Sequence, residues 1–139
     1  IRVSELISLD VSDIDLQQCT LRCRSSNRER TIPILRKCIG IMKEYIENVR
    51  PFMLKDKNEQ ALFVNTNGKR LTRQGFWKIV KYYTSKANIN KDITPHTLRH
   101  SFAAHLIQMG RNLKDVQMIL GHSDISSTQV YRQIVSGNV

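Results

Sequence analysis

The chain has 139 residues, the length of one ordinary domain, and 40% of them are apolar, which is enough to bury a core. Its 22 Lys and Arg against 12 acids leave a net charge of +10, an excess typical of a small domain that binds a polyanion such as nucleic acid. We expect no membrane contact, because no apolar run approaches the roughly 20 residues of a span and no helix joins a basic face to a broad aromatic face.

The first part of the chain predicts a helix followed by a small sheet. Apolar residues at helical spacing indicate a helix over residues 2–8. Short strands are expected over 14–16 and 20–24, and the alternation over 28–34 is typical of a returning strand after a Ser/Asn turn. The segment should therefore form an antiparallel sheet with a basic hairpin. The hairpin carries Arg22, Arg24, Arg28 and Arg30.

The middle of the chain predicts two helices around a short strand. An amphipathic pattern favours a helix over residues 35–49, stopped before Pro51. The apolar run 61–64 predicts a strand. Thr72 can cap a helix that extends to about Ala87. A second basic cluster lies ahead of that helix and consists of Lys69, Arg70 and Arg73.

The last part of the chain is predicted to be helical. Thr94 followed by Pro95 is typical of a helix start, and Gly110 of its end. Apolar spacing indicates another helix over 113–120, and a capping box at 126–129 indicates a last short one. The sequence thus predicts a mainly helical α+β domain with one small antiparallel sheet. The three cysteines, without a CxxC pair, are typical of a reducing cytosol and are Cys19, Cys23 and Cys38.

Histidine, arginine and tyrosine supply the candidate chemistry. His96 and Arg99 share one face of a helix, an arrangement suited to gripping a phosphate, although such a pair also occurs by chance on solvated faces. His96 and His100 have metal-ligand spacing, but the Glu of an HExxH motif is absent, so we expect no metal. Taken singly, His122 is typical of a helix cap and Tyr131 of a packing residue. Their joint order carries the signal.

Three stretches resemble the signature boxes of the tyrosine recombinase family, in its Xer-like branch of bacterial and phage integrases. The first is Arg2-Val3-Ser4-Glu5-Leu6. The second is Thr94-Pro95-His96-Thr97-Leu98-Arg99-His100-Ser101-Phe102-Ala103. The third is Leu120-Gly121-His122-Ser123 with Thr128-Gln129-Val130-Tyr131. The spacing also agrees with the family, since Arg99 and His122 are 23 positions apart and His122 and Tyr131 are 9 apart. The resemblance covers nearly the whole chain.

The resemblance implies a fold, a reaction and a set of catalytic residues. Residues 1–139 should form the helical catalytic domain, as a fragment without the family's N-terminal DNA-clamping (core-binding) domain. Tyr131 would attack the scissile phosphate to form a 3′-phosphotyrosyl link, while Arg2 and Arg99 clamp the non-bridging oxygens. His96 would assist proton transfer and His122 would hydrogen-bond the phosphate. A covalent intermediate conserves the bond energy, so the resemblance implies no metal and no cofactor.

The implied partner is double-stranded DNA, bound by a homotetramer or together with a related recombinase. The basic side chains expected to contact DNA are Arg24, Arg28, Lys69, Arg70 and Arg73. The implied location is the bacterial cytoplasm, on the nucleoid. A type IB topoisomerase would share the chemistry but fits the boxes less well, and a basic structural domain would require the boxes to be accidental.

One departure from the family pattern leaves an alternative open. The family carries a hairpin lysine in a Gly-Lys-Gly turn, where it protonates the leaving oxygen, but here that slot falls on Ser25 or Ser26. Arginine is a poor substitute because it stays protonated. Another donor such as Lys69 could act, cleavage could be slow, or the chain could be a catalytically impaired DNA-binding relative.

Overall fold

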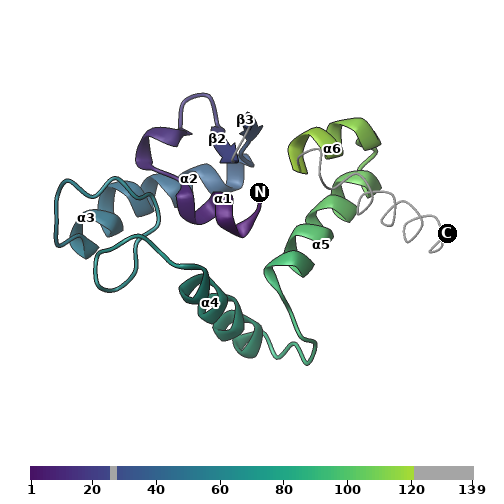
Figure 1. The fold of residues 1–139 in the computed structure, drawn as a ribbon. Coiled ribbons are helices and arrows are strands. Elements are labelled where there is room, and N and C mark those ends of the chain that lie inside the picture. Colours follow the sequence, from purple (N-terminus) through teal and green to yellow (C-terminus); the bar gives the residue numbers. More distant parts are fainter. Residues whose placement is uncertain (26–27, 121–139) are drawn as a thin grey trace. The chain divides into compact units, whose positions relative to one another are not determined.

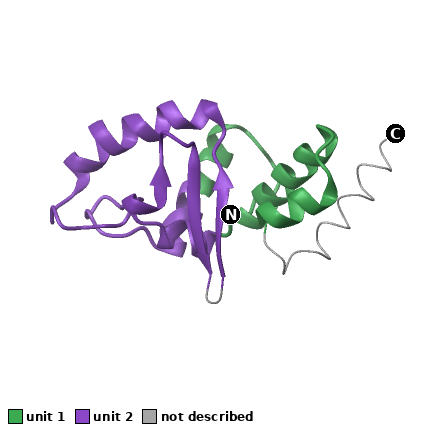
Figure 2. Cartoon of the chain, turned by 90° about the horizontal axis from the view of Figure 1, so that it is seen from above, with its two compact units in different colours: residues 1–2, 80–139 green, residues 3–79 purple. Residues whose placement is uncertain are grey.

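The computed structural model describes residues 1–25 and 28–120 and is mainly helical with one small sheet, as predicted (Figure 1). Two compact units make up the chain: unit 1 holds residues 1–2 and 80–139, and unit 2 holds residues 3–79 (Figure 2). None of the described helices is long and apolar enough to cross a membrane. The elements are α1 (Val3–Ser8), η1 (Val11–Asp13), β1 (Ile14–Asp15), β2 (Thr20–Ser25), β3 (Arg28–Pro33), α2 (Arg36–Glu44), η2 (Tyr45–Val49), α3 (Arg50–Met53), α4 (Arg73–Lys86), α5 (Pro95–Gln108) and α6 (Leu113–Leu120).

The sheet of unit 2 is antiparallel in the order β1-β2-β3, which confirms the predicted hairpin. Side chains alternate across it, so Cys23 is fully buried while Arg22 and Arg24 lie on the opposite face. Helix α1 contacts β2. Burial raises the pKa of the Cys23 thiol. The sheet therefore has one face in the core and one face rich in arginine.

The predicted helix stop before Pro51 was wrong. Helix α2 runs into a π-helical turn, η2, and continues as α3, so that the segment forms a nearly continuous rod (Figure 2). Pro51 falls in the first turn of α3, directly after the π turn, where the regular i to i−4 bonding of the helix is already interrupted. The turn is closed by the Arg50 N–H, which donates to the Tyr45 carbonyl five residues earlier.

The predicted strand 61–64 was also wrong, because only single bridges form there. Ala61 pairs with Asp10 and Val64 with Arg70. The Leu62 N–H donates to the Leu9 carbonyl at 2.9 Å. Burial is continuous rather than alternating along this run, so it crosses the core as an irregular segment. The buried apolar residues of unit 2 include Leu9, Cys23, Ile32, Ala61, Leu62, Val64 and Leu71.

The turn that follows requires glycine at one position. Gly68 has φ +73°, and a Cβ there would lie 2.6 Å from the Met53 carbonyl oxygen. After the turn, the Thr72 hydroxyl accepts a hydrogen bond from the Gly75 N–H at 3.0 Å. This confirms the predicted cap, and α4 then ends at Lys86, one residue before the predicted end.

Unit 1 contains α5, which carries the second signature box, and α6, which ends at the first residue of the third box. Thr94 caps α5 by accepting from the Thr97 N–H at 3.0 Å, and Gly110 (φ +85°) follows its end, both as predicted. Helices α5 and α6 pack around a small apolar core of Ala103, Val116 and Leu120. The short helix predicted near residues 126–131 lies outside the described residues.

Candidate active site

Helix α5 places the predicted histidine and arginine of the second box on one side. His96 and Arg99 lie in its first turns, one turn apart. The ring of His96 stands 4.0 Å from the ring of His100, centroid to centroid, with a 54° angle between them. His96 and His100 have the sequence spacing of a metal-binding pair. Among the described residues, no group of three His, Cys, Asp or Glu side chains could hold a metal ion.

The guanidinium of Arg99 lies at the end of α6. Its Nη2 donates to the carbonyl of Leu120, the last residue of that helix. Helix C-termini carry partial negative charge on their last carbonyls, so a cation is favoured there. The bond holds Arg99 beside the point where the chain leaves α6, and in the sequence His122 follows two residues later.

Three of the five predicted catalytic residues fall in the same compact unit. Arg2 groups with unit 1, which also contains His96 and Arg99. The other two, His122 and Tyr131, lie outside the described residues. The assembly of all five around a phosphate stays a prediction.

In unit 2, a buried carboxylate organises the base of the hairpin. Asp13 Oδ1 accepts from Arg22 Nε and Nη2, both at 3.1 Å, and from Arg24 Nη2 at 2.8 Å. Its Oδ2 accepts from the Asp10 N–H at 2.9 Å. Burial acts to raise the pKa of Asp13, but this hydrogen bond and the two guanidiniums outweigh burial and hold the pKa below its usual value. The carboxylate is therefore ionised at neutral pH, and it orients both arginines.

The position at which the family carries its hairpin lysine, here Ser25 or Ser26 and called the serine slot below, lies at the end of this hairpin. Ser25 is exposed, and its hydroxyl donates to the Arg28 carbonyl at 3.2 Å. Ser26 lies outside the described residues. Arg28, predicted to bind DNA, is exposed at the start of β3. The described part of the turn thus presents a hydroxyl and a guanidinium where the resemblance leads us to expect a lysine.

The second basic cluster divides into exposed and tethered side chains. Lys69 and Arg73 are exposed. Arg70 instead donates to the carbonyls of Ile7 at 2.9 Å and Leu9 at 3.0 Å, and it pairs with Asp10. The structure thus gives Arg70 an internal role that sequence reasoning missed, because its acceptors are some sixty positions away. DNA contacts by this cluster stay a prediction.

A second internal pair was also missed. Glu5 of α1 is buried and accepts two hydrogen bonds from the guanidinium of Arg30 on β3. The pair joins the first signature box to the hairpin. The available signal was a carboxylate among the apolar positions of a short helix, since buried acids are almost always paired.

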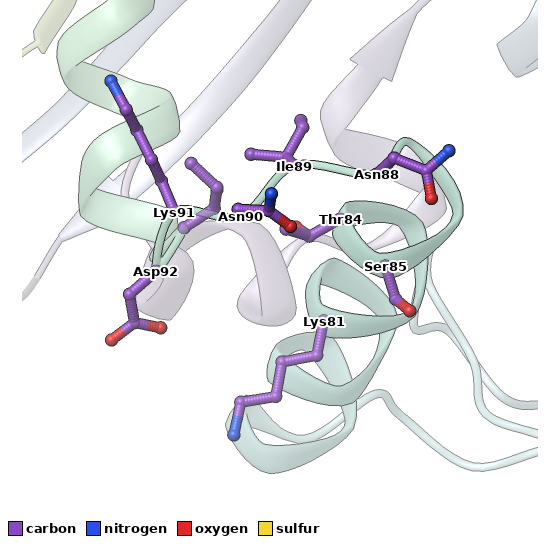
Figure 3. Close-up of a pocket in the computed structure, with 9 residues that line it drawn as sticks. Lys81, Thr84, Ser85, Asn88, Ile89, Asn90, Lys91 and Asp92 are labelled. Carbon is purple, nitrogen blue, oxygen red and sulfur yellow. The ribbon is translucent and has the colours of Figure 1, made fainter.

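One pocket of about 380 Å³ lies where α4 leads into α5. Figure 3 shows that the side chains of Lys81 and Lys91 extend in different directions, so the pocket does not bring two cations to one point. We assign it no ligand. Its lining consists of Lys81, Thr84, Ser85, Asn88, Ile89, Asn90, Lys91, Asp92 and Ile93.

Comparison with known proteins identifies relatives over nearly the whole chain. The sequence model of the phage integrase family matches residues 1–136. Tyrosine recombinase XerD of Staphylococcus epidermidis is 51% identical over 139 residues, which are 99% of this chain and 47% of the relative. Tyrosine recombinase XerD of Oceanobacillus iheyensis is 50% identical over 141 residues, covering 100% of this chain and 48% of the relative. The chain spans about half the length of these curated relatives.

Solved structures agree in fold. The crystal structure of XerA recombinase matches with a TM-score of 0.85 and 32% identity, over 94% of this chain and 47% of that chain. XerH site-specific recombinase, in a post-cleavage complex with a palindromic difH substrate, matches with a TM-score of 0.81 and 25% identity, over 99% of this chain and 39% of that chain.

Proposed function

Because the chain belongs to the phage integrase family, we propose that it is the catalytic part of a site-specific DNA recombinase. Its reaction is the cleavage and rejoining of DNA strands through a 3′-phosphotyrosyl bond on Tyr131. The observation that carries the proposal is the grouping of Arg2, His96 and Arg99 in one compact unit. Arg99 is held there at the end of α6, from which the chain leads to His122.

The proposed reaction assigns one role to each candidate residue of the chain. The phenol oxygen of Tyr131 attacks the phosphorus, and the bond to the 5′ oxygen breaks. The 5′ oxygen takes a proton from a general acid, for which Lys69 is our candidate, and leaves as a 5′-hydroxyl. Arg2 and Arg99 stabilise the charge on the non-bridging oxygens, and His122 hydrogen-bonds the same phosphate. A phenol has an ordinary pKa near 10, so its proton needs an acceptor, a role we give to His96. Attack by the 5′-hydroxyl of another strand reverses the steps and restores Tyr131.

The proposed partner is duplex DNA, on which four subunits assemble. Complexes of related recombinases with their DNA support this choice, among them XerH with difH and the Tn1549 transposon integrase with circular intermediate DNA. The net charge of +10 favours the same partner. The proposed location is the cytoplasm, on nucleoid DNA, and the catalytic domain boundary at residues 1–139 stays part of the proposal.

A second candidate is a DNA-binding relative that does not cleave. It is favoured by the hairpin, where the lysine slot falls on Ser25 or Ser26 and the Ser25 hydroxyl donates to the Arg28 carbonyl. A serine hydroxyl is a much weaker acid than a lysine ammonium, so protonation of the leaving 5′ oxygen would need another donor. Lys69 is exposed in the same unit and is our candidate donor.

A suicide DNA substrate, nicked close to the cleavage point, separates the two candidates. Recombinase activity predicts a covalent protein–DNA adduct that disappears in Tyr131→Phe. An adduct that persists in this variant would show that Tyr131 is not the nucleophile. No adduct despite salt-sensitive DNA binding would favour the second candidate, and a large gain in cleavage by Ser25→Lys would then show that the acid slot is vacant.

A further inference from the structure

An exposed carboxylate lies against the two arginines that Asp13 holds. Glu29 Oε1 is 3.5 Å from Arg22 Nε and 3.9 Å from Arg24 Nε. Both distances are too long for a good hydrogen bond, so charge alone keeps Glu29 there. Its side chain is 60% exposed, whereas that of Asp13 is only 2% exposed. One carboxylate is thus a fixed part of the fold and the other is a loosely held counterion.

The charges of this group fit a single monoanion. Two guanidiniums face two carboxylates, and because Asp13 is buried with four hydrogen bonds, it cannot leave. The arginines and Asp13 together leave one positive charge, which Glu29 neutralises. A DNA phosphodiester also carries one negative charge and, like a carboxylate, presents two oxygens. It can replace Glu29 without changing the charge of the group.

We propose that Arg22 and Arg24 form a site for a DNA backbone phosphate, and that Glu29 occupies this site until DNA displaces it. This inference rests on the proposed function, because DNA is the ligand. Arg22 and Arg24 are two residues apart on β2 and therefore project from the same face of the sheet. The site is at the base of the hairpin whose turn contains the serine slot.

The geometry makes the exchange inexpensive. Asp13 already orders both arginine side chains. The arginines therefore lose little additional side-chain entropy when a phosphate binds them. Glu29 breaks no hydrogen bond with the arginines when it leaves, because it makes none with them. Its exposed carboxylate then returns to water, where ions are well solvated. Glu29 therefore weakens DNA binding through competition, not through the fold.

Fluorescence anisotropy with a labelled duplex of arbitrary sequence tests the competition. We expect Glu29→Gln to bind about two- to five-fold more tightly than wild type at low salt, as expected for an exposed charge pair. The gain should shrink at high salt because exposed charges are screened. The matched control is Glu47→Gln, which removes an exposed acid of the same unit away from the arginines. If it gains as much as Glu29→Gln, net charge explains the effect and the site is wrong.

The arginines provide the second arm. The gain from Glu29→Gln should vanish in an Arg22→Gln, Arg24→Gln background, and a gain that persists there would overturn the proposal. In wild type, the Nε–H signals of Arg22 and Arg24 should shift on titration with the duplex. Inorganic phosphate at the same phosphate concentration should shift them far less, and equal shifts would reassign the site to free phosphate. If wild type binds no DNA, the proposed function fails, whereas normal binding without the Glu29 effect removes only this inference.

Discussion

The two units use arginine in different ways. In unit 2, residues 3–79 contain fourteen Lys and Arg and nine acids, and all the ion pairs described above lie there. In unit 1, residues 80–120 contain six Lys and Arg and two acids, and Arg99 bonds a helix-end carbonyl. A carboxylate neutralises an arginine, whereas a carbonyl orients it and leaves its charge in place. The difference teaches that unit 2 fixes several cations against carboxylates around its sheet, whereas a helix end in unit 1 orients Arg99, for which we propose a role at the phosphate.

The largest stability effect should come from the buried pair of unit 2. Glu5→Gln leaves the guanidinium of Arg30 facing an uncharged amide, and breaking a buried pair costs about 3–5 kcal/mol. Urea unfolding followed by circular dichroism measures the loss, with Glu47→Gln as the exposed control. A loss no larger than that of the control would contradict a structural role for the pair.

Asp13→Asn should cost somewhat less, about 3 kcal/mol at neutral pH, because charge-assisted hydrogen bonds to two arginines weaken. The folded-state pKa of Asp13 is lowered, so its stabilisation is complete above the pKa of an unfolded aspartate, near 4. It is lost as pH falls through the lower folded pKa. Unfolding curves across this acidic range should show the wild type and the variant converging, and a constant difference would contradict the assignment.

Substitution of one glycine in each unit compares the cost of adding a Cβ at a positive-φ position. Gly68→Ala in unit 2 should cost about 2 kcal/mol or more, because it combines positive φ with a Cβ 2.6 Å from the Met53 oxygen. Gly110→Ala in unit 1 also has positive φ, but no atom lies within 4 Å of its Cβ. It should cost only about 1 kcal/mol. Thermal unfolding of both variants measures the difference, and equal losses would show that strain alone matters at Gly68.

Arg99→Gln should change the unfolding free energy as little as Gly110→Ala does. The variant loses a partly buried hydrogen bond to Leu120, worth about 1 kcal/mol. Adduct formation should nevertheless fall on the order of a hundredfold or more, since one donor to the reacting phosphate is lost. The comparison between the units fails if this variant unfolds as easily as Glu5→Gln, because Arg99 would then serve the fold.

Local signals predicted the helices that carry the candidate site. Thr94 and Gly110 predicted the two ends of α5 correctly, because helix capping depends on residues that are close in sequence. The π turn before Pro51 and the irregular run 61–64 were missed, since both depend on packing between distant segments. Partners of Arg30 and Arg70 could not be read from the sequence for the same reason. The order and spacing of the motifs identified the candidate catalytic residues, but they do not give the distances between those side chains in the folded chain.

The π turn also constrains how long this part of the chain can be. Residues five apart lie about 140° apart around an α-helix, but the extra residue in η2 brings Arg50 over Tyr45. Tyr45 can therefore donate its hydroxyl to the Leu62 carbonyl at 2.8 Å, while Arg50 Nε donates to the Ala61 carbonyl at 2.9 Å. Deleting one residue within η2 would restore a regular helix but turn one of these anchors away. Insertions and deletions should accordingly be tolerated in the exposed loop after α3 and selected against inside the rod.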